Sequence, residues 1–429
     1  ELSVLGGMAS STPYLRLRVL VKHLFNPPSL EADATSLRKS TREGSVVVVG
    51  GLNQDILARA EGDLAKETSN MGAVTETWGG VAHNIALCLA KLRVSPHMIT
   101  AVGGSDSVGK QMANYLESVS IKKSGLIAIP NCRSNRYLAI LNQEGDLVAS
   151  IADMKAVEKL SPSLLASYTR TKWFRAAEML VLDGNLSKES ISFLASFSSS
   201  MLSSHTSSSS FSVFFEPTSL EKSTRCLDAW RRGNVHFMSP NALELRRIAA
   251  EIEDIRAKTQ HAKTGSIDDG SDSGISIVDL KSTRMKTQQA PLPKQVCDDV
   301  VTALRAIPLE MRRRNNYHII ITRGSKGVVA ASSHANSPHA CRMTHVPPQP
   351  VQTVESTSGA GDTLAGALIW SLLTHSHNTS SSSESLQSAS HGIVVKALQY
   401  GVAAAALSVG SKESISPLIS CERLEESVY

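Results

Sequence analysis

Segments typical of strands and helices alternate along the chain from Ser45 onwards. Residues 45–51, SVVVVGG, form a β-branched run that ends in glycines, as expected of a strand buried on both faces. The later segment GGVAHNIALCLAKL carries apolar residues at helical spacing, and the order of strand and helix then repeats. This alternation predicts an α/β fold in which helices cover a mostly parallel sheet.

Polar residues follow three of the predicted strands, EMLVLDGN, FSVFFEP and VHFMSPN. They are Asp183, Asn185, Glu216 and Asn241. Open α/β sheets bind ligands at the carboxyl ends of their strands. We therefore expect a functional site at this edge of the sheet.

Residues 125–154 depart from the alternation. GLIAI, RYLAIL and DLVASI are short apolar segments separated by PNCRSN and NQEG, a pattern typical of an antiparallel meander. Together with residues of about 55–78, this region predicts a small β-sheet that stands off the main sheet. Such a sheet would form a lid over a ligand.

Three segments rich in Ser, Gly, Asp and Thr interrupt the pattern near residues 198–210, 258–293 and 376–390. Their composition cannot supply a packed core, so we expect inserted loops that are mobile and take no part in the chemistry. Residues 1–44 precede the first strand and form an N-terminal extension to the domain at 45–429. The chain opens at Glu1 rather than methionine, as expected of a fragment or a processed product.

The composition argues against several classes of protein. The net charge of +5 comes from 44 basic and 39 acidic residues in scattered clusters, and 4% aromatic residues offer few stacking platforms. This does not indicate a nucleic-acid partner. No apolar run reaches the roughly 20 residues of a membrane span, and the six cysteines lack zinc-site spacing. We expect an intracellular protein, with the cytoplasm as first choice and an organelle as the alternative.

The strongest chemical motif is GAGDTLAGALIWSLL, which begins with Gly359, Ala360, Gly361 and Asp362. Its leucines share one face, so a buried helix should start at or just before Asp362. Small residues let a phosphoryl group approach the amides of a helix N-terminus, and a neighbouring carboxylate can accept a proton from an attacking hydroxyl. The alternative is that Ser358 or Asp362 only caps a core helix. This segment alone does not decide between them.

A competing phosphate loop is GSDSVGKQ, at residues 104–111, which has the glycine and lysine spacing of a Walker A motif. However, Gln111 stands where a Ser or Thr would bind magnesium. We therefore favour an ordinary turn between a strand and a helix.

Three further segments carry polar residues at predicted strand or helix ends. Asn53 and Asp55 in GGLNQDIL could bind two sugar hydroxyls, although a polar loop is the simpler interpretation. Gly80 precedes a helix whose first turn contains Asn84, and a bare turn is the default interpretation there. In SPNALELRRIA, Glu244 could orient a magnesium-bound water or only favour the helix dipole.

In their order along the chain, these motifs resemble those of the ribokinase-like (PfkB) carbohydrate kinases over about residues 45–420. The matching segments are GGLNQD, GGVAHNIA, DSVG, the meander, PNALE, TRGSKG and GAGDTLAG. Several motifs in one order are far more specific than any one of them. The resemblance implies a three-layer α/β sandwich with a mostly parallel central sheet and a small β-sheet lid.

The resemblance also implies roles for individual residues. Asp362 would be the base that activates a sugar 5′-hydroxyl, with the amides of Gly359, Ala360 and Gly361 as the anion hole. The acceptor would be held by Asn53, Asp55, Gly80 and Asn84, with Asp153 facing it from near the lid. The ATP phosphates and Mg²⁺ would be served by Asn241 and by Glu244, the metal ligand. The nucleotide site would be lined by Thr322, Gly324 and Gly327.

Within the family, GDLVASIADM, LVLDGNLS and FEPTSLEKS are most similar to segments of the pseudouridine kinases. This implies ATP-dependent phosphorylation of pseudouridine. The alternatives are ribose, adenosine or another nucleoside or sugar as acceptor and, in a different class, a catalytically silent binding protein. A homodimer is also compatible with the resemblance.

The N-terminal segments TPYLRLRVL and SLEADATSLRKS resemble the closing helices of pseudouridine-5′-phosphate glycosidase. Either the chain is the kinase part of a fusion with that enzyme, or it carries an ordinary basic extension.

Three residues depart from the family pattern. His83 stands where pseudouridine kinases usually carry arginine, and Arg323 replaces a more usual apolar residue. Ser356 lies where ribokinase has an aspartate associated with its monovalent-cation site, which leaves a requirement for K⁺ open.

Overall fold

A computed structural model describes residues 43–104, 106–202, 212–262, 275–282, 292–375 and 386–428. Residues 1–42 lie outside the described part. The predicted N-terminal extension is therefore untested, except that Glu43 and Gly44 belong to the first strand of the domain.

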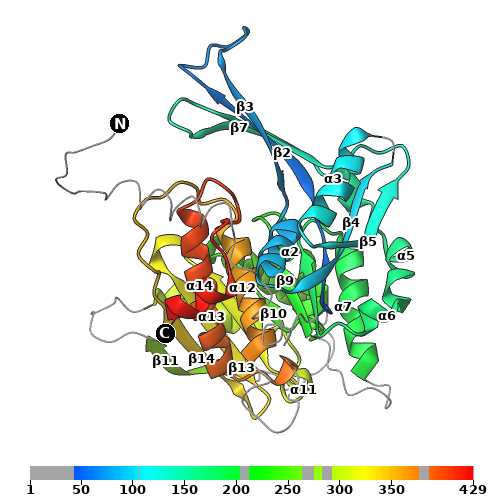
Figure 1. Cartoon of the computed structure of the whole chain (residues 1–429). Coiled ribbons are helices and arrows are strands. Elements are labelled where there is room, and N and C mark those ends of the chain that lie inside the picture. The colour runs from blue at the N-terminus through cyan, green and yellow to red at the C-terminus, as the bar shows by residue number, and fades with distance from the viewer. Residues whose placement is uncertain are drawn as a thin grey trace, which may run out of the picture. The chain divides into compact units, whose positions relative to one another are not determined.

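Ten strands form the main sheet (Figure 1), in the order β11-β14-β13-β12-β10-β9-β8-β1-β4-β5. Their bounds are β1 Glu43–Val49, β4 Ser95–Gly103, β5 Lys122–Ile129, β8 Met179–Asp183, β9 Ser212–Glu216, β10 Phe237–Met238, β11 Ser276–Ser282, β12 Tyr317–Thr322, β13 Val328–His334 and β14 Ser337–Val346. Neighbouring strands pair in parallel, except that β13 is antiparallel to β12 and β14. The predicted mostly parallel sheet is confirmed.

The side chains of β1 show how the three layers are built. Val46 and Val48 pack into a core with α2, α3, α12 and α13, whereas Val47 and Val49 pack into a second core with α7, α9 and α10. All four are fully buried, which explains why this strand is β-branched throughout. The long helices are α2 Val81–Lys91, α3 Ser107–Ser118, α7 Lys188–Leu202, α9 Ala242–Ala262, α10 Lys294–Arg305, α12 Ala360–His375 and α13 His391–Val409. The shorter ones are α4 Lys155–Glu158, α5 Pro162–Leu165, α6 Lys172–Arg175, α8 Leu227–Arg231, α11 Leu309–Arg312 and α14 Cys421–Val428.

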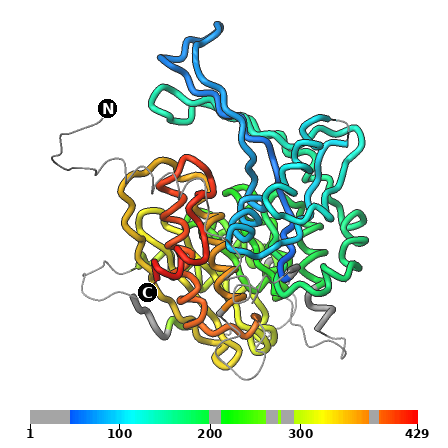
Figure 2. The backbone as a smooth tube through the Cα atoms, viewed as in Figure 1, coloured from blue at the N-terminus to red at the C-terminus, as the bar shows by residue number. Residues whose placement is uncertain are grey.

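A second sheet of four strands, which we call the lid, extends away from the main sheet (Figure 2). Its order is β3-β2-β6-β7, with β2 Asn53–Ala60, β3 Gly72–Gly79, β6 Arg136–Leu141 and β7 Leu147–Asp153. The predicted small sheet is confirmed, but the inclusion of GLIAI in it was wrong. That segment lies in β5, which pairs in parallel with β4 because α3 forms a crossover between the two strands.

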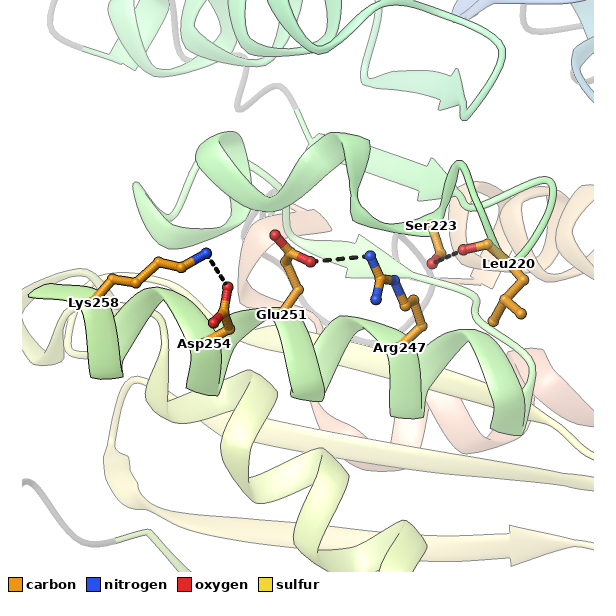
Figure 3. A network of polar contacts seen from close by, with 6 residues as sticks. All are labelled: Leu220, Ser223, Arg247, Glu251, Asp254 and Lys258. Carbon is orange, nitrogen blue, oxygen red and sulfur yellow. Dashed lines mark hydrogen bonds and ion pairs between the residues drawn. The ribbon is translucent and has the colours of Figure 1, made fainter.

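The three predicted loops are partly structured, and for those parts the loop prediction was wrong. Helix α7 continues to Leu202 and α9 to Ala262, while residues 276–282 form β11 on the edge of the main sheet. In α9, ion pairs one turn apart accompany the extension, with 2.6 Å between Lys258 Nζ and Asp254 Oδ2 (Figure 3). Residues 386–390 are also described and place Leu386 in the core. Residues 203–211, 263–274, 283–291 and 376–385 lie outside the described part.

Helix α13 is, by length and composition, apolar enough to cross a membrane, but half of that segment is buried within the protein. Its alanines and Gly401 allow close packing on α12, since a Cβ atom at Gly401 would lie 2.9 Å from the carbonyl oxygen of Leu364. The apolar composition is therefore explained by helix packing in the core.

Candidate active site

Asp362 and Asn84 meet where α12 and α2 begin. Asn84 Nδ2 donates a hydrogen bond of 2.8 Å to Asp362 Oδ2, and both side chains are buried. Burial raises the pKa of Asp362 to about 7, although the hydrogen bond from Asn84 opposes the rise and the Asp183 carboxylate adds to it. A carboxyl group that ionises near neutral pH is suited to accept a proton during catalysis.

The helix-capping alternative does not account for Asp362. Among the described residues its hydrogen-bond partner is Asn84, on another helix, rather than an amide of α12. The Ser358 amide donates to Ser356 Oγ at 3.1 Å, which belongs to the turn before α12. The carboxylate is therefore held by a tertiary contact.

The glycines before Asp362 have two different functions in the turn. Gly359 has a φ of 74°, and a Cβ atom there would lie 2.3 Å from the carbonyl oxygen of Ser414, so the fold requires glycine. At Gly361 a Cβ atom would meet nothing within 4 Å, which leaves open space in front of the backbone. Ala360 and Gly361 both face a cavity. A ligand could thus approach the first amides of α12.

Three of the predicted acceptor residues gather where the lid joins α2. Asn53 donates a short side-chain hydrogen bond to Asp55, and burial raises the pKa of Asp55 to about 6 against the effect of that bond. Gly80 has a φ of 106°, and a Cβ atom there would lie 2.6 Å from Asn53 Oδ1. These contacts bring Asn53, Asp55 and Gly80 to the same end of α2 as Asn84.

Asp183, at the end of β8, accepts hydrogen bonds from several segments that surround this region. It is fully buried, and its carboxylate accepts hydrogen bonds from the amides of Gly51 at 2.9 Å and Ala82 at 3.2 Å. Asn185 adds its own amide and its side-chain Nδ2, both at 2.9 Å. Lys222 Nζ in turn donates to Asn185 Oδ1 at 2.6 Å. Burial raises the pKa of Asp183, and the four N–H donors oppose the rise.

The position of Asp183 at the carboxyl edge was predicted, but its role was not. It holds Gly51 two residues before Asn53, and Ala82 two residues before Asn84. The signal in the sequence is the buried strand LVLD followed by GN, which places an acidic residue where it must find donors. Two of its donors, Gly51 and Ala82, lie more than one hundred residues away in the sequence, so the local pattern does not identify them.

Asp153 is the last residue of β7 and lies in the lid. It pairs in register with Arg136 of β6, which pairs in turn with Gln54 of β2. No described hydrogen bond joins it to Asn84 or Asp362, so its contact with a substrate stays a prediction.

A cavity of about 480 Å³ lies beside Gly361, and the residues that line it do not include any of the lid strands. Its walls are mostly apolar and come from the β12–β13 turn, the loop before α12, α12 itself and α13. The predicted residues Thr322, Gly324 and Gly327 line it. Val402, Ala405, Ala406 and Val409 of α13 form one wall, although the sequence motifs did not single them out. The volume suits a ligand of the size of a nucleotide base and sugar.

Asn241 and Glu244 form a capping box at the start of α9. Asn241 Oδ1 accepts from the Glu244 amide at 2.9 Å, and Glu244 Oε2 accepts from the Asn241 amide at 2.8 Å. Asn241 forms an isolated parallel β-bridge with Thr322, so this capping box lies beside the turn that lines the cavity. Burial raises the pKa of Glu244, and the bond from Asn241 opposes the rise.

The carboxylates in this region fit a hard cation. Burial raises the pKa of Glu216 well above its usual value, and the charges of Asp362 and Glu244 add to this rise. Carboxylate oxygens are hard donors of the kind that bind Mg²⁺. Among the described residues no three such ligands converge on one point. The ion would therefore be held by one or two carboxylates, by water and by substrate phosphates.

The competing phosphate loop is occupied by its own side chain. Asp106 caps α3 by accepting from the Gly109 amide at 2.8 Å and also accepts from Ser134 Oγ at 2.7 Å. The amide that would face a phosphate in a Walker A loop is thus already bound to a carboxylate. This agrees with the interpretation of the segment as an ordinary strand–helix turn.

Comparison with known proteins assigns the fold and the family. The model of the pfkB family carbohydrate kinases matches residues 43–298 and 290–421. The chain belongs to this family. The predicted resemblance is confirmed, and the match covers the lid, the main sheet and α12.

Individual relatives are more distant. A pseudouridine kinase from Escherichia coli is 26% identical over 204 residues, which cover 48% of this chain and 60% of that relative. A pseudouridine-metabolizing bifunctional protein from Schizosaccharomyces pombe is 26% identical over 338 residues, covering 76% of this chain and 43% of that relative. The chain thus spans about half the length of these relatives.

The Arabidopsis thaliana ribokinase solved with ribose and ATP shares the fold, with a TM-score of 0.58 and 17% identity. The alignment covers 89% of this chain and 98% of the ribokinase chain. The expected ribokinase-like sandwich is confirmed.

Proposed function

We propose that the chain is a kinase that transfers the γ-phosphoryl group of ATP to the 5′-hydroxyl of pseudouridine. The observation that carries the proposal is the buried Asp362–Asn84 pair at 2.8 Å. It lies between a cavity of nucleotide size and a group of polar residues at the lid. The names of the E. coli and S. pombe relatives support pseudouridine as the acceptor.

In this mechanism Asp362 accepts the proton of the 5′-hydroxyl as the oxygen attacks the γ-phosphorus. The new O–P bond forms while the bond from the γ-phosphorus to the β,γ-bridging oxygen breaks, and ADP leaves. The amides of Gly359, Ala360 and Gly361 stabilise the charge on the phosphoryl oxygens. Asn53, Asp55, Gly80 and Asn84 orient the sugar, and Asp153 faces it from the lid.

On the nucleotide side, Thr322, Gly324 and Gly327 would contact the adenosine part of ATP, and Asn241 would serve its phosphates. Glu244 would hold Mg²⁺ through its free oxygen or a water, and the ion would supply charge neutralisation of the phosphates. The protein residues then position the two substrates and exclude water, which accounts for most of the catalysis in phosphoryl transfer.

Two alternatives are separated from the proposal by one assay. ADP formation is measured with Mg²⁺-ATP and equal concentrations of pseudouridine, uridine, adenosine, inosine and ribose. We expect the highest kcat/KM for pseudouridine. Rapid turnover of ribose or adenosine with none of pseudouridine would reassign the acceptor, and ATP binding without turnover of any acceptor would favour a silent binding protein.

The S. pombe relative is bifunctional, which supports a functional or covalent link to a pseudouridine-5′-phosphate glycosidase. We propose that the chain acts inside the cell, together with such an enzyme. A homodimer through the lid is also part of this proposal, since Val74 and Ile151 of the lid are 66% and 69% exposed.

A further inference from the structure

A chain of side-chain hydrogen bonds leads from α3 to Asp362, and the mechanism above uses only its last member. Tyr115 Oη lies 3.2 Å from His83 Nε2, and His83 Nδ1 lies 3.2 Å from Asn84 Oδ1. Asn84 Nδ2 then donates to Asp362 Oδ2 at 2.8 Å. His83 is fully buried and Asn84 is 6% exposed, so water is excluded from the two inner contacts, whereas Tyr115 at the outer end of the chain is partly buried.

The donors and acceptors of this chain fit together in one way. An ionised Asp362 can only accept, so Asn84 must present its NH₂ group to it and its carbonyl oxygen to His83. His83 must then carry its proton on Nδ1 and accept at Nε2 from the Tyr115 hydroxyl. Each member therefore sets the orientation or tautomer of the next.

We propose that His83 and Tyr115 are positioning residues, which hold the Asn84 amide in the orientation that supports the ionised form of Asp362. The inference rests on the role of Asp362 as the base in the proposed function. It gives a role to His83, one of the three residues that depart from the family pattern.

The surroundings keep both residues in the required protonation states. Burial lowers the pKa of His83 to about 4, against the effect of the bond to Asn84, so the ring is neutral at the pH of the cell. Burial and the charge of Glu413 raise the pKa of Tyr115 to about 12, so its hydroxyl stays a donor. Trp78 of β3 lies against Tyr115, with ring centroids 5.5 Å apart, and this contact connects the lid to the chain.

Without the Tyr115 hydroxyl, the proton of His83 is no longer held on Nδ1. The orientation of the Asn84 amide is then no longer fixed. Asn84 can then turn its carbonyl oxygen toward Asp362, which disfavours the ionised base. The other titratable groups that interact electrostatically with Asp362 are Asp183, Glu216 and Cys88. No described hydrogen bond joins any of them to Tyr115, so a change in the pH profile would arise from the hydrogen-bonded chain itself.

The test compares Tyr115→Phe with the wild type in kcat against pH, with whichever acceptor the wild type phosphorylates fastest. The acidic limb should move up by about 0.5–1 pH unit, the size expected when one hydrogen bond to a carboxylate is lost. At pH 6.5 kcat should fall about three- to eightfold, whereas the KM for ATP should not change. His83→Phe should give a larger shift, and His83→Gln, which keeps a donor and an acceptor, should restore part of it.

Ile85→Val provides the matched control, because Ile85 is a fully buried residue of the same helix that belongs to the core. It should lower the Tm without moving the pH profile. A Tyr115→Phe profile that superimposes on that of the wild type, or that falls equally at every pH, would overturn the proposal.

A second measurement does not depend on turnover. ¹⁵N chemical shifts of labelled histidine, with the His83 signal assigned by its loss in His83→Phe, report the tautomer of the ring. A proton on Nδ1 that shifts to a mixture in Tyr115→Phe supports the chain, and a proton on Nε2 in the wild type overturns it. If the wild type phosphorylates no acceptor, the proposed function fails. The tautomer of His83 still shows whether the hydrogen-bonded chain exists.

Discussion

The two sides of the Asp362 carboxylate are built on different physical principles. On the acceptor side, buried carboxylates accept hydrogen bonds from specific donors, as from the Asn84 side chain to Asp362 and from the Gly51 backbone amide to Asp183. On the nucleotide side, a cavity of about 480 Å³ is bounded mainly by apolar side chains and by a glycine-containing turn. Hydrogen-bonded sites discriminate through unpaired polar groups, whereas apolar cavities discriminate through shape. The acceptor side should therefore be sensitive to isosteric changes and the nucleotide side to added volume.

The largest difference between the effects on acceptor binding and on ATP binding is expected for Asp183→Asn. Both carboxylate oxygens accept from N–H groups, so either orientation of an amide places its NH₂ group against a donor. Loss of such a charged hydrogen bond costs about 1.5–3 kcal/mol, or about 10- to 150-fold in affinity. Steady-state kinetics should show that rise in the KM of the acceptor, with the KM for ATP unchanged.

Val181→Ala is the control for Asp183→Asn, because Val181 is fully buried on the same strand. It should lower the free energy of unfolding by about 2 kcal/mol and leave both KM values as they are. Equal losses of acceptor and ATP affinity in Asp183→Asn would show that Asp183 supports the fold in general and not the acceptor side.

A smaller effect, on the nucleotide side of the site, is expected for Ala406→Leu. Ala406 lines the cavity, so three added carbon atoms fill space that the adenosine part of ATP would occupy. The KM for ATP should rise about 5- to 10-fold, which corresponds to an overpacking cost of about 1–1.4 kcal/mol. Ala406→Gly, which adds no volume, should keep ATP affinity within about twofold. If Ala406→Leu raised the KM of the acceptor instead, the assignment of the cavity would be wrong.

The smallest effect is expected for Arg247→Gln, outside both sides of the site. Arg247 pairs with Glu251 at 3.2 Å on the exposed face of α9 (Figure 3). Surface pairs of this kind contribute about 0.3–0.5 kcal/mol. Both KM values should stay constant, and Tm by differential scanning calorimetry should change by no more than about 2 °C. Glu244 already assigns the first turn of α9 to the proposed site, so a marked loss of activity would extend that role to the Arg247–Glu251 face of the helix.

Local patterns in the sequence predicted the features that depend on local physics. The β-branched run of β1 gave its burial on both faces, and small residues followed by apolar ones marked the start of α12 at Ala360. The order of the motifs predicted the fold and family, since several matches together are specific.

Features that depend on distant partners could not be predicted in this way. GLIAI could belong to either sheet until its neighbour β4 was known, and residues 276–282 look like part of a loop without β14 beside them. The hydrogen bonds of Asp183 and the link from Tyr115 to His83 join residues from separate elements. Spacing along the chain carries no information about such pairs.

The central claim is that Asp362 is the catalytic base between two independently built sides. It is tested most directly by Asp362→Asn, with kcat, ATP affinity by calorimetry and thermal stability measured on the same preparation. Wild-type kcat should fall as the pH drops below about 7, because the carboxyl group is then protonated. At pH 8 Asp362→Asn should lower kcat by about 10²- to 10⁴-fold and leave the Kd of ATP unchanged.

Although Asp362→Asn should lose activity, its free energy of unfolding should rise. Because burial raises the pKa of Asp362 from 3.8 to about 7, the wild type loses stability as the pH rises through this interval. At pH 8 Asp362→Asn should therefore be more stable than the wild type, by at most about 4 kcal/mol. An inactive, stabilised variant that still binds ATP is the predicted result. Retained turnover, or loss of ATP binding together with activity, would contradict the account.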